Sequence, residues 1–179
     1  MHRTLYVLVY PSRLFAAHWS FWIPYLDADG RESDVGDRIH VTGDRLNGFQ
    51  YEHLRHYNVR EDERLPNSFP IGLLDPASVE KGNGHDWGIS GVAEEITPVN
   101  RFDKVCREVE APGPSLNKVA TTAVPNVTAG APKKREVRDC QWWIKQAAAH
   151  LVEAGVLLPL DKAHGGGTPA DKVAALPKH

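Results

Sequence analysis

The chain has 179 residues and a mass of 19.9 kDa, which suits one domain with a substantial buried core and makes a second complete domain unexpected. Hydrophobic residues make up 41% and charged residues 25%, as in ordinary soluble globular proteins. The formal charge of −2 argues against a nucleic-acid partner, for which a clearly basic face is expected.

The cysteine content indicates a reducing compartment. Cys106 and Cys140 are too few for a disulfide framework and lack the Cys-x-x-Cys spacing of zinc and redox sites. We therefore expect reduced thiols in a cytoplasmic protein. No stretch of the sequence is long and apolar enough to predict a membrane span.

The first half of the chain predicts β-strands. Residues 5–10 are a continuous apolar and aromatic run closed by Pro11, which is typical of a central strand. Residues 38–42 predict a short strand after a polar turn, and residues 48–54 and 70–74 predict two more.

Residues 18–24 predict a strand with two different faces. The apolar face carries Trp19, Phe21 and Ile23, and the mixed face carries His18, Ser20 and Trp22. The strand at 38–42 should return antiparallel beside it. In the simplest register, His18 and His40 then project to the same face of one hairpin.

Two further histidines are weaker candidates for a site. His53 and His56 stand three residues apart, a spacing that metal ligands can have, but no third ligand is near them in the sequence. A solvated strand edge is the simpler interpretation.

The second half of the chain predicts helices and loops. Residues 98–108 carry apolar side chains at helical spacing, and Cys106 falls on the apolar stripe, so we expect it to be structural. Residues 111–137 are rich in Pro, Ala and Thr and predict a long loop or lid. We expect residues 1–160 to form a single catalytic-type domain and residues 161–179 to form a flexible tail.

The clearest chemical signal is a cysteine at the start of a predicted helix. Asp139 is expected to cap the helix, which makes Cys140 its first residue, and Trp143, Ala147 and Leu151 continue an apolar stripe. A thiol at a helix N-terminus faces unpaired N–H groups and the positive end of the helix dipole, which favour thiolate. The alternative is a small buried hydrophobe beside two tryptophans.

A nucleophilic cysteine needs a base and a group that orients the base. The hairpin supplies two imidazoles, one to exchange a proton with Cys140 and one to fix the tautomer of the first. Because the chain has nine histidines, a chance pairing on one hairpin is the competing interpretation.

Three segments resemble a known family. They are His18-Trp19-Ser20-Phe21-Trp22-Ile23, Ile39-His40-Val41 and Asp139-Cys140-Gln141-Trp142-Trp143. They look like the permuted, NlpC-type branch of the papain-like cysteine fold, which contains lecithin:retinol acyltransferase and its relatives. In that branch two histidine-bearing strands precede a nucleophile that opens a helix in an Asn-Cys-Glu-His type motif. The chain as a whole also looks like a group of small uncharacterised fungal proteins.

The resemblance covers residues 5–45 and 136–157, and it implies an α+β fold in which an antiparallel sheet packs against helices. It implies that Cys140 is the nucleophile, His18 the base and His40 the orienting group. The chain departs from the family motif at Asp139, which stands for Asn, and at Gln141-Trp142, which stand for Glu-His. The spacing of 22 residues between the two histidines is longer than in the acyltransferases (40 − 18).

The implied reaction is acyl transfer through a thioester, without a cofactor, on an amide or ester of a small molecule or peptide. Trp22, Gln141 and Trp142 are the candidate substrate-binding residues. Two alternatives remain open. One is a catalytically silent member of the fold that binds a peptide or metabolite, and the other is a metal protein using His18, His40 and Cys140 as ligands.

Overall fold

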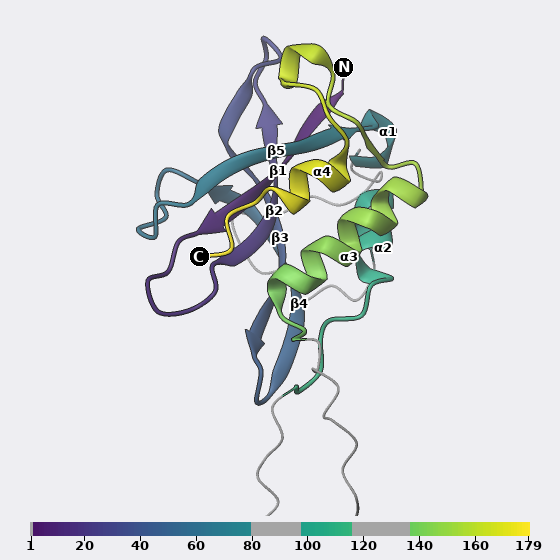
Figure 1. Ribbon diagram of the computed structural model, residues 1–179. Helices are drawn as coiled ribbons and strands as arrows, with labels where there is room; N and C mark the ends of the chain where they lie inside the picture. The colour runs from purple at the N-terminus through teal and green to yellow at the C-terminus, as the bar shows by residue number, and fades with distance from the viewer. Residues whose placement is uncertain (1, 80–97, 116–136) are drawn as a thin grey trace, which may run out of the picture.

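The computed structural model describes residues 2–79, 98–115 and 137–179. Six strands form one antiparallel sheet in the order β4-β3-β2-β1-β5-β6 (Figure 1). In chain order the strands are β1 (Arg3–Tyr10), β2 (His18–Leu26), β3 (Glu32–Asp44), β4 (Gly48–Asn58), β5 (Asn67–Leu74) and β6 (Leu157–Leu158). The helices are α1 (Pro76–Val79), α2 (Arg101–Arg107), α3 (Cys140–Glu153), the short 3-10 helix η1 (Lys162–His164) and α4 (Pro169–Ala174). This arrangement confirms the predicted α+β class.

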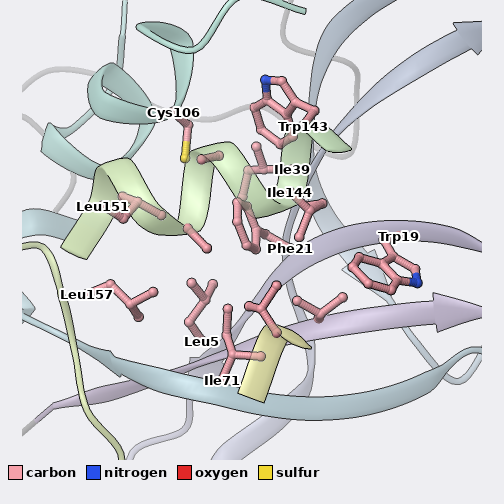
Figure 2. Packing of buried hydrophobic residues seen from close by; sticks show 14 of the residues in the cluster. Leu5, Trp19, Phe21, Ile39, Ile71, Cys106, Trp143, Ile144, Leu151 and Leu157 are labelled. Atoms are coloured by element: carbon pink, nitrogen blue, oxygen red, sulfur yellow. The ribbon is translucent and has the colours of Figure 1, made fainter. Parts of the chain in front are cut away.

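Strand β2 lies in the middle of the core and follows the predicted alternation. Trp19 and Phe21 are fully buried on the face that packs against α3, and Ile39 of the neighbouring strand β3 lies beside them. Phe21, Ile39 and Ile144 of α3 belong to the same buried core cluster (Figure 2). The ring centroids of Phe21 and Trp143 are 5.9 Å apart. Packing of this face therefore sets the position of α3 on the sheet.

Helix α3 follows the sequence pattern closely. Trp143, Ala147 and Leu151 are fully buried, as their helical spacing predicted, and Gly155 follows the helix with a φ of 67°. Cys106 of α2 is also fully buried, with its sulfur directed toward α3, so its predicted place on the apolar stripe is confirmed (Figure 2). Within the described ranges, no helix has the length and apolar character needed to cross a membrane.

The opposite face of the sheet carries a smaller aromatic cluster. Leu8, Tyr10 and Trp22 are buried there, and Tyr57 packs against them. Arg38 lies within this cluster with only 4% exposure, and its guanidinium carbon is 4.8 Å from the centre of the Tyr10 ring. Because His18 and His40 share this face, the cluster forms one side of their surroundings.

Helix α2 begins later than the apolar spacing predicted. The predicted helix covered residues 98–108, whereas α2 spans Arg101–Arg107. The reason is that the Asn100 side chain accepts a hydrogen bond from the N–H of Asp103 at 2.8 Å and caps the helix. Residues 116–136 of the predicted loop at 111–137 lie outside the part of the chain that the structure describes.

Residues 161–179, predicted as a flexible tail, instead form η1 and α4 and pack on the protein. Thr168 caps α4 and Pro169 occupies its first turn. Val173 and Leu176 are each 5% exposed and join the main core. Burial of these two side chains supplies the free energy that orders the segment. The glycine run that precedes the segment had indicated a flexible tail instead.

Candidate functional site

Cys140 opens α3, as the sequence predicted. The Asp139 carboxylate accepts hydrogen bonds from the N–H groups of Gln141 and Trp142 at 3.0 and 3.1 Å. Arg45 pairs with the same carboxylate at 3.0 Å. This cap uses the N–H groups of the second and third helical residues and not the N–H of Cys140. The N–H of Cys140 lowers the pKa of the thiol on the same residue.

The Cys140 thiol lies at the point where β2 and β3 separate. The two strands pair from Leu26–Glu32 to Phe21–Ile39, so the first residues of β2 lie beyond their last pair. The backbone N–H of Trp19 lowers the pKa of the Cys140 thiol, which places this N–H near the sulfur. The thiol therefore lies against the peptide group that follows His18.

The two hairpin histidines form a pair. His18 Nε2 is 2.7 Å from His40 Nδ1, and the rings meet edge to face at 82°. The rings of Tyr10 and His18 are 5.6 Å apart. Because Nε2 of His18 is engaged by His40, Nδ1 is the ring nitrogen of His18 that lies outside the pair.

Both imidazoles are neutral at physiological pH. Burial lowers the pKa of His18 to about 4, and the nearby charge of Arg38 lowers it further in the same direction. Burial and Arg38 likewise lower the pKa of His40 to about 2. A buried cationic neighbour disfavours a second positive charge, so each ring carries one proton and one lone pair.

The prediction that the resting thiol favours thiolate is wrong. Burial raises the pKa of the Cys140 thiol to about 11, although the N–H groups of Trp19, Gln141 and Cys140 oppose this effect. Desolvation of the thiolate outweighs the hydrogen bonds at the helix N-terminus because the side chain is only 8% exposed. At rest the Cys140 thiol and the two imidazoles are therefore all neutral.

The predicted substrate-binding residues lie in three different surroundings. The Gln141 amide donates to the backbone oxygens of Ala17 and Lys178 at 2.8 and 3.0 Å and so ties segments of the fold together. Trp22 lines a hollow of about 770 Å³ on the face opposite α3. Trp142 lines another, of about 320 Å³, between α2 and α3, with Arg138 over its ring at 4.9 Å. The structure does not bring the two tryptophans into one pocket.

Two residues of the site were missed by the sequence analysis. Arg38 precedes His40 by two residues and shares its face, and its Nε donates to Ser20 Oγ at 3.2 Å. Glu52 pairs with His40 in the β3–β4 register. The alternation of side chains along the strand that predicted the face of His40 also predicts Arg38 on the same face. Predicting that Glu52 lies opposite His40 requires the register of the two strands, which the sequence pattern does not supply.

The metal alternative receives no support from this geometry. Nitrogens that share a tetrahedral metal ion each bind it, whereas His18 Nε2 and His40 Nδ1 are hydrogen-bonded to one another at 2.7 Å. In the described part of the chain, no group of three or more His, Cys, Asp or Glu side chains is arranged to hold a metal ion.

The molecule is thus an α+β protein with a cysteine-initiated helix packed at the open end of a histidine-bearing hairpin. Residues 5–158 match the family model of DUF6540, a family of unknown function, and the chain belongs to this family. Neither the curated proteins nor the solved structures contain a match.

Proposed function

We propose that this chain is a thiol-dependent acyl-transfer enzyme, either a hydrolase or an acyltransferase, with Cys140 as nucleophile, His18 as base and His40 as orienting group. One observation carries the proposal. The 2.7 Å hydrogen bond between the two imidazoles fixes His18 at the start of β2, where the Cys140 thiol lies against the next peptide N–H. The order of hairpin and cysteine helix, which resembles the permuted NlpC-type branch of the papain-like fold, supports the same assignment.

The first half of the reaction forms a thioester. His18 Nδ1 takes the proton of the neutral thiol while sulfur attacks the carbonyl carbon of an amide or ester. The oxyanion accepts a hydrogen bond from the Cys140 N–H, which the Asp139 cap leaves unused. The C–N or C–O bond then breaks, and the leaving amine or alcohol takes the proton from His18.

The second half restores the thiol. His18 removes a proton from water, an amine or an alcohol as that acceptor attacks the thioester carbonyl, and the sulfur leaves and takes the proton back. Water gives a carboxylic acid, and the other acceptors give an amide or ester. Because thiol and imidazoles are neutral at rest, the proton moves only as the sulfur–carbon bond forms.

A second candidate is a catalytically silent member of the fold that binds a peptide or metabolite. The raised pKa of Cys140 favours it, since a thiol held neutral is a weak nucleophile unless a base assists. The two candidates differ in one measurable respect, which is whether Cys140 becomes acylated.

The test uses 4-nitrophenyl acetate as a simple activated ester. The proposal predicts a burst of nitrophenolate and an acetyl group on the peptide that contains Cys140, both lost in Cys140→Ala and His18→Ala. Cys106→Ala is the matched control, and it should keep the burst because that thiol is fully buried in the core. Wild-type protein without acetyl-Cys140 would support the silent alternative. Undiminished acetylation in folded His18→Ala would show that His18 is not the base.

A further inference from the structure

Glu52 lies directly across the β3–β4 pair from His40. Its Oε2 is 3.3 Å from His40 Nε2, and the two side chains are 20% and 5% exposed. Among the described residues no group forms an ordinary hydrogen bond with this buried nitrogen, so the carboxylate is the acceptor that faces it. A carboxylate accepts hydrogen bonds and donates none, so it favours a proton on the nitrogen that it faces.

Glu52 therefore continues the line formed by the two histidines. His40 joins them, with Nε2 toward Glu52 and Nδ1 toward His18 Nε2 at 2.7 Å. In a neutral imidazole one nitrogen donates and the other accepts. The position of the proton on His40 consequently determines which nitrogen of His18 carries a proton.

We infer that Glu52 is a positioning residue that keeps the His40 proton on Nε2, so that His40 Nδ1 accepts from His18 Nε2–H and His18 Nδ1 presents a lone pair. The role toward Cys140 rests on the proposed function. In the opposite arrangement a lone pair of His40 faces the carboxylate, which is repulsive, and His18 carries its proton on the nitrogen that must accept one. Glu52 thus selects the tautomer that can act as a base.

The direct test is nitrogen-15 NMR of the histidine rings, because protonated and unprotonated ring nitrogens have distinct chemical shifts. Signals are assigned by comparison with His18→Ala and His40→Asn. The wild type should show protonated Nε2 on both histidines and unprotonated His18 Nδ1. In Glu52→Gln the amide can donate or accept, so both tautomers should appear. A protonated Nδ1 on wild-type His18, or unchanged tautomers in Glu52→Gln, would overturn the inference.

The control for this test is Glu153→Gln at the far end of α3. It removes the same charge from a side chain that is 78% exposed, and it should leave the histidine signals as in the wild type. A change in those signals equal to that of Glu52→Gln would show that overall charge, rather than position, sets the tautomers.

The kinetic test measures acetylation of Cys140 by 4-nitrophenyl acetate. Glu52→Gln should slow it about tenfold, as expected for loss of the attraction between a carboxylate and the ring N–H that it faces. In the His40→Asn background the same change should have little further effect, because Glu52 acts through the imidazole. Equal slowing in both backgrounds would overturn the inference.

The NMR result separates the two claims. If wild-type Cys140 is not acetylated while the rings show the expected tautomers that depend on Glu52, the proposed function fails and the positioning role stands. If Cys140 is acetylated but the tautomers do not depend on Glu52, the enzyme assignment stands and the positioning role fails.

Discussion

His53 is a buried residue whose charge depends on two carboxylates. Its Nε2 is 3.7 Å from Asp37 Oδ2 and its Nδ1 is 3.8 Å from Asp103 Oδ1, which are ion-pair distances. Burial lowers the pKa of His53, but attraction by the Asp103 and Asp37 carboxylates outweighs it and raises the pKa overall. Below this raised pKa, the imidazolium connects β3, β4 and α2 inside the protein.

Replacing His53 by Gln should destabilise the protein in a pH-dependent way. A raised folded pKa stabilises the native state fully below the unfolded value, about 6.5, and this stabilisation is lost as pH rises through the folded pKa. We expect His53→Gln to lower the free energy of unfolding by about 3 kcal/mol at pH 6 and by less at pH 9, measured by urea denaturation.

His56→Gln is the control for this experiment, because His56 is exposed on the same strand. Its effect on stability should be small. A cost for His53→Gln that does not change between the two pH values would contradict the charged state assigned to His53.

At the scale of single residues, the sequence predicted what depends on local pattern. The Asp139 cap, Cys140 as first helical residue and the buried Cys106 all follow from spacing along one element. The prediction that His53 lies at a solvated strand edge is wrong, since His53 is 2% exposed and Asp103, which helps to bury it, comes from a separate helix. Burial of a polar group depends on which distant segment covers it, and periodicity carries no such information.

At the scale of elements, Gln141 of α3 connects its own helix with the start of β2 and with the C-terminal segment. Its amide nitrogen donates to the oxygens of Ala17 and Lys178, and the Trp19 indole donates to the oxygen of Pro177 at 2.9 Å. Residues 177–178 are thereby held against the first residues of both β2 and α3. These contacts fix the two elements that carry His18 and Cys140 relative to one another.

Removing the Gln141 amide should loosen this junction. Gln141→Ala leaves the carbonyls of Ala17 and Lys178 without that donor, and one unpaired buried acceptor costs about 1–3 kcal/mol. We expect a decrease of this size in the free energy of unfolding, measured in urea. Gln146→Ala, an exposed site on the same helix, should change it by less than about 0.5 kcal/mol. Equal effects of the two substitutions would show that the bridge does not stabilise the fold.

Elements with strong periodicity were predictable, and short elements were not. β2 and α3 each bury one face, so their sequences repeat with the period of a strand and of a helix. α4 is only 6 residues long, too short to show a helical period, and it follows a run of three glycines. The Thr168-Pro169 start was the available signal, since a capping residue followed by proline is typical of a helix N-terminus.

At the scale of the whole molecule, the candidate site depends on topology. A hairpin near the beginning of the chain supplies His18 and His40, and a helix near its end supplies Cys140. The sheet places β2 between β3 and β1, and α3 packs on β2 and β3, so the cysteine reaches the place where these two strands separate. The sequence supplied the three residue types and their elements. The 2.7 Å histidine contact, the position of Glu52 opposite His40 and the neutral resting state required the packed structure.

The most direct test of the central claim is the rate of Cys140 alkylation by iodoacetamide across pH, followed by peptide mass spectrometry. If His18 serves as the base, the wild-type rate should rise near its lowered pKa, about 4, and remain measurable at neutral pH. His18→Ala should react only as pH approaches the raised pKa of the thiol, about 11, and His40→Asn should fall between the two. A pH profile of folded His18→Ala that superimposes on the wild type would contradict the assignment of His18 and Cys140 to one site.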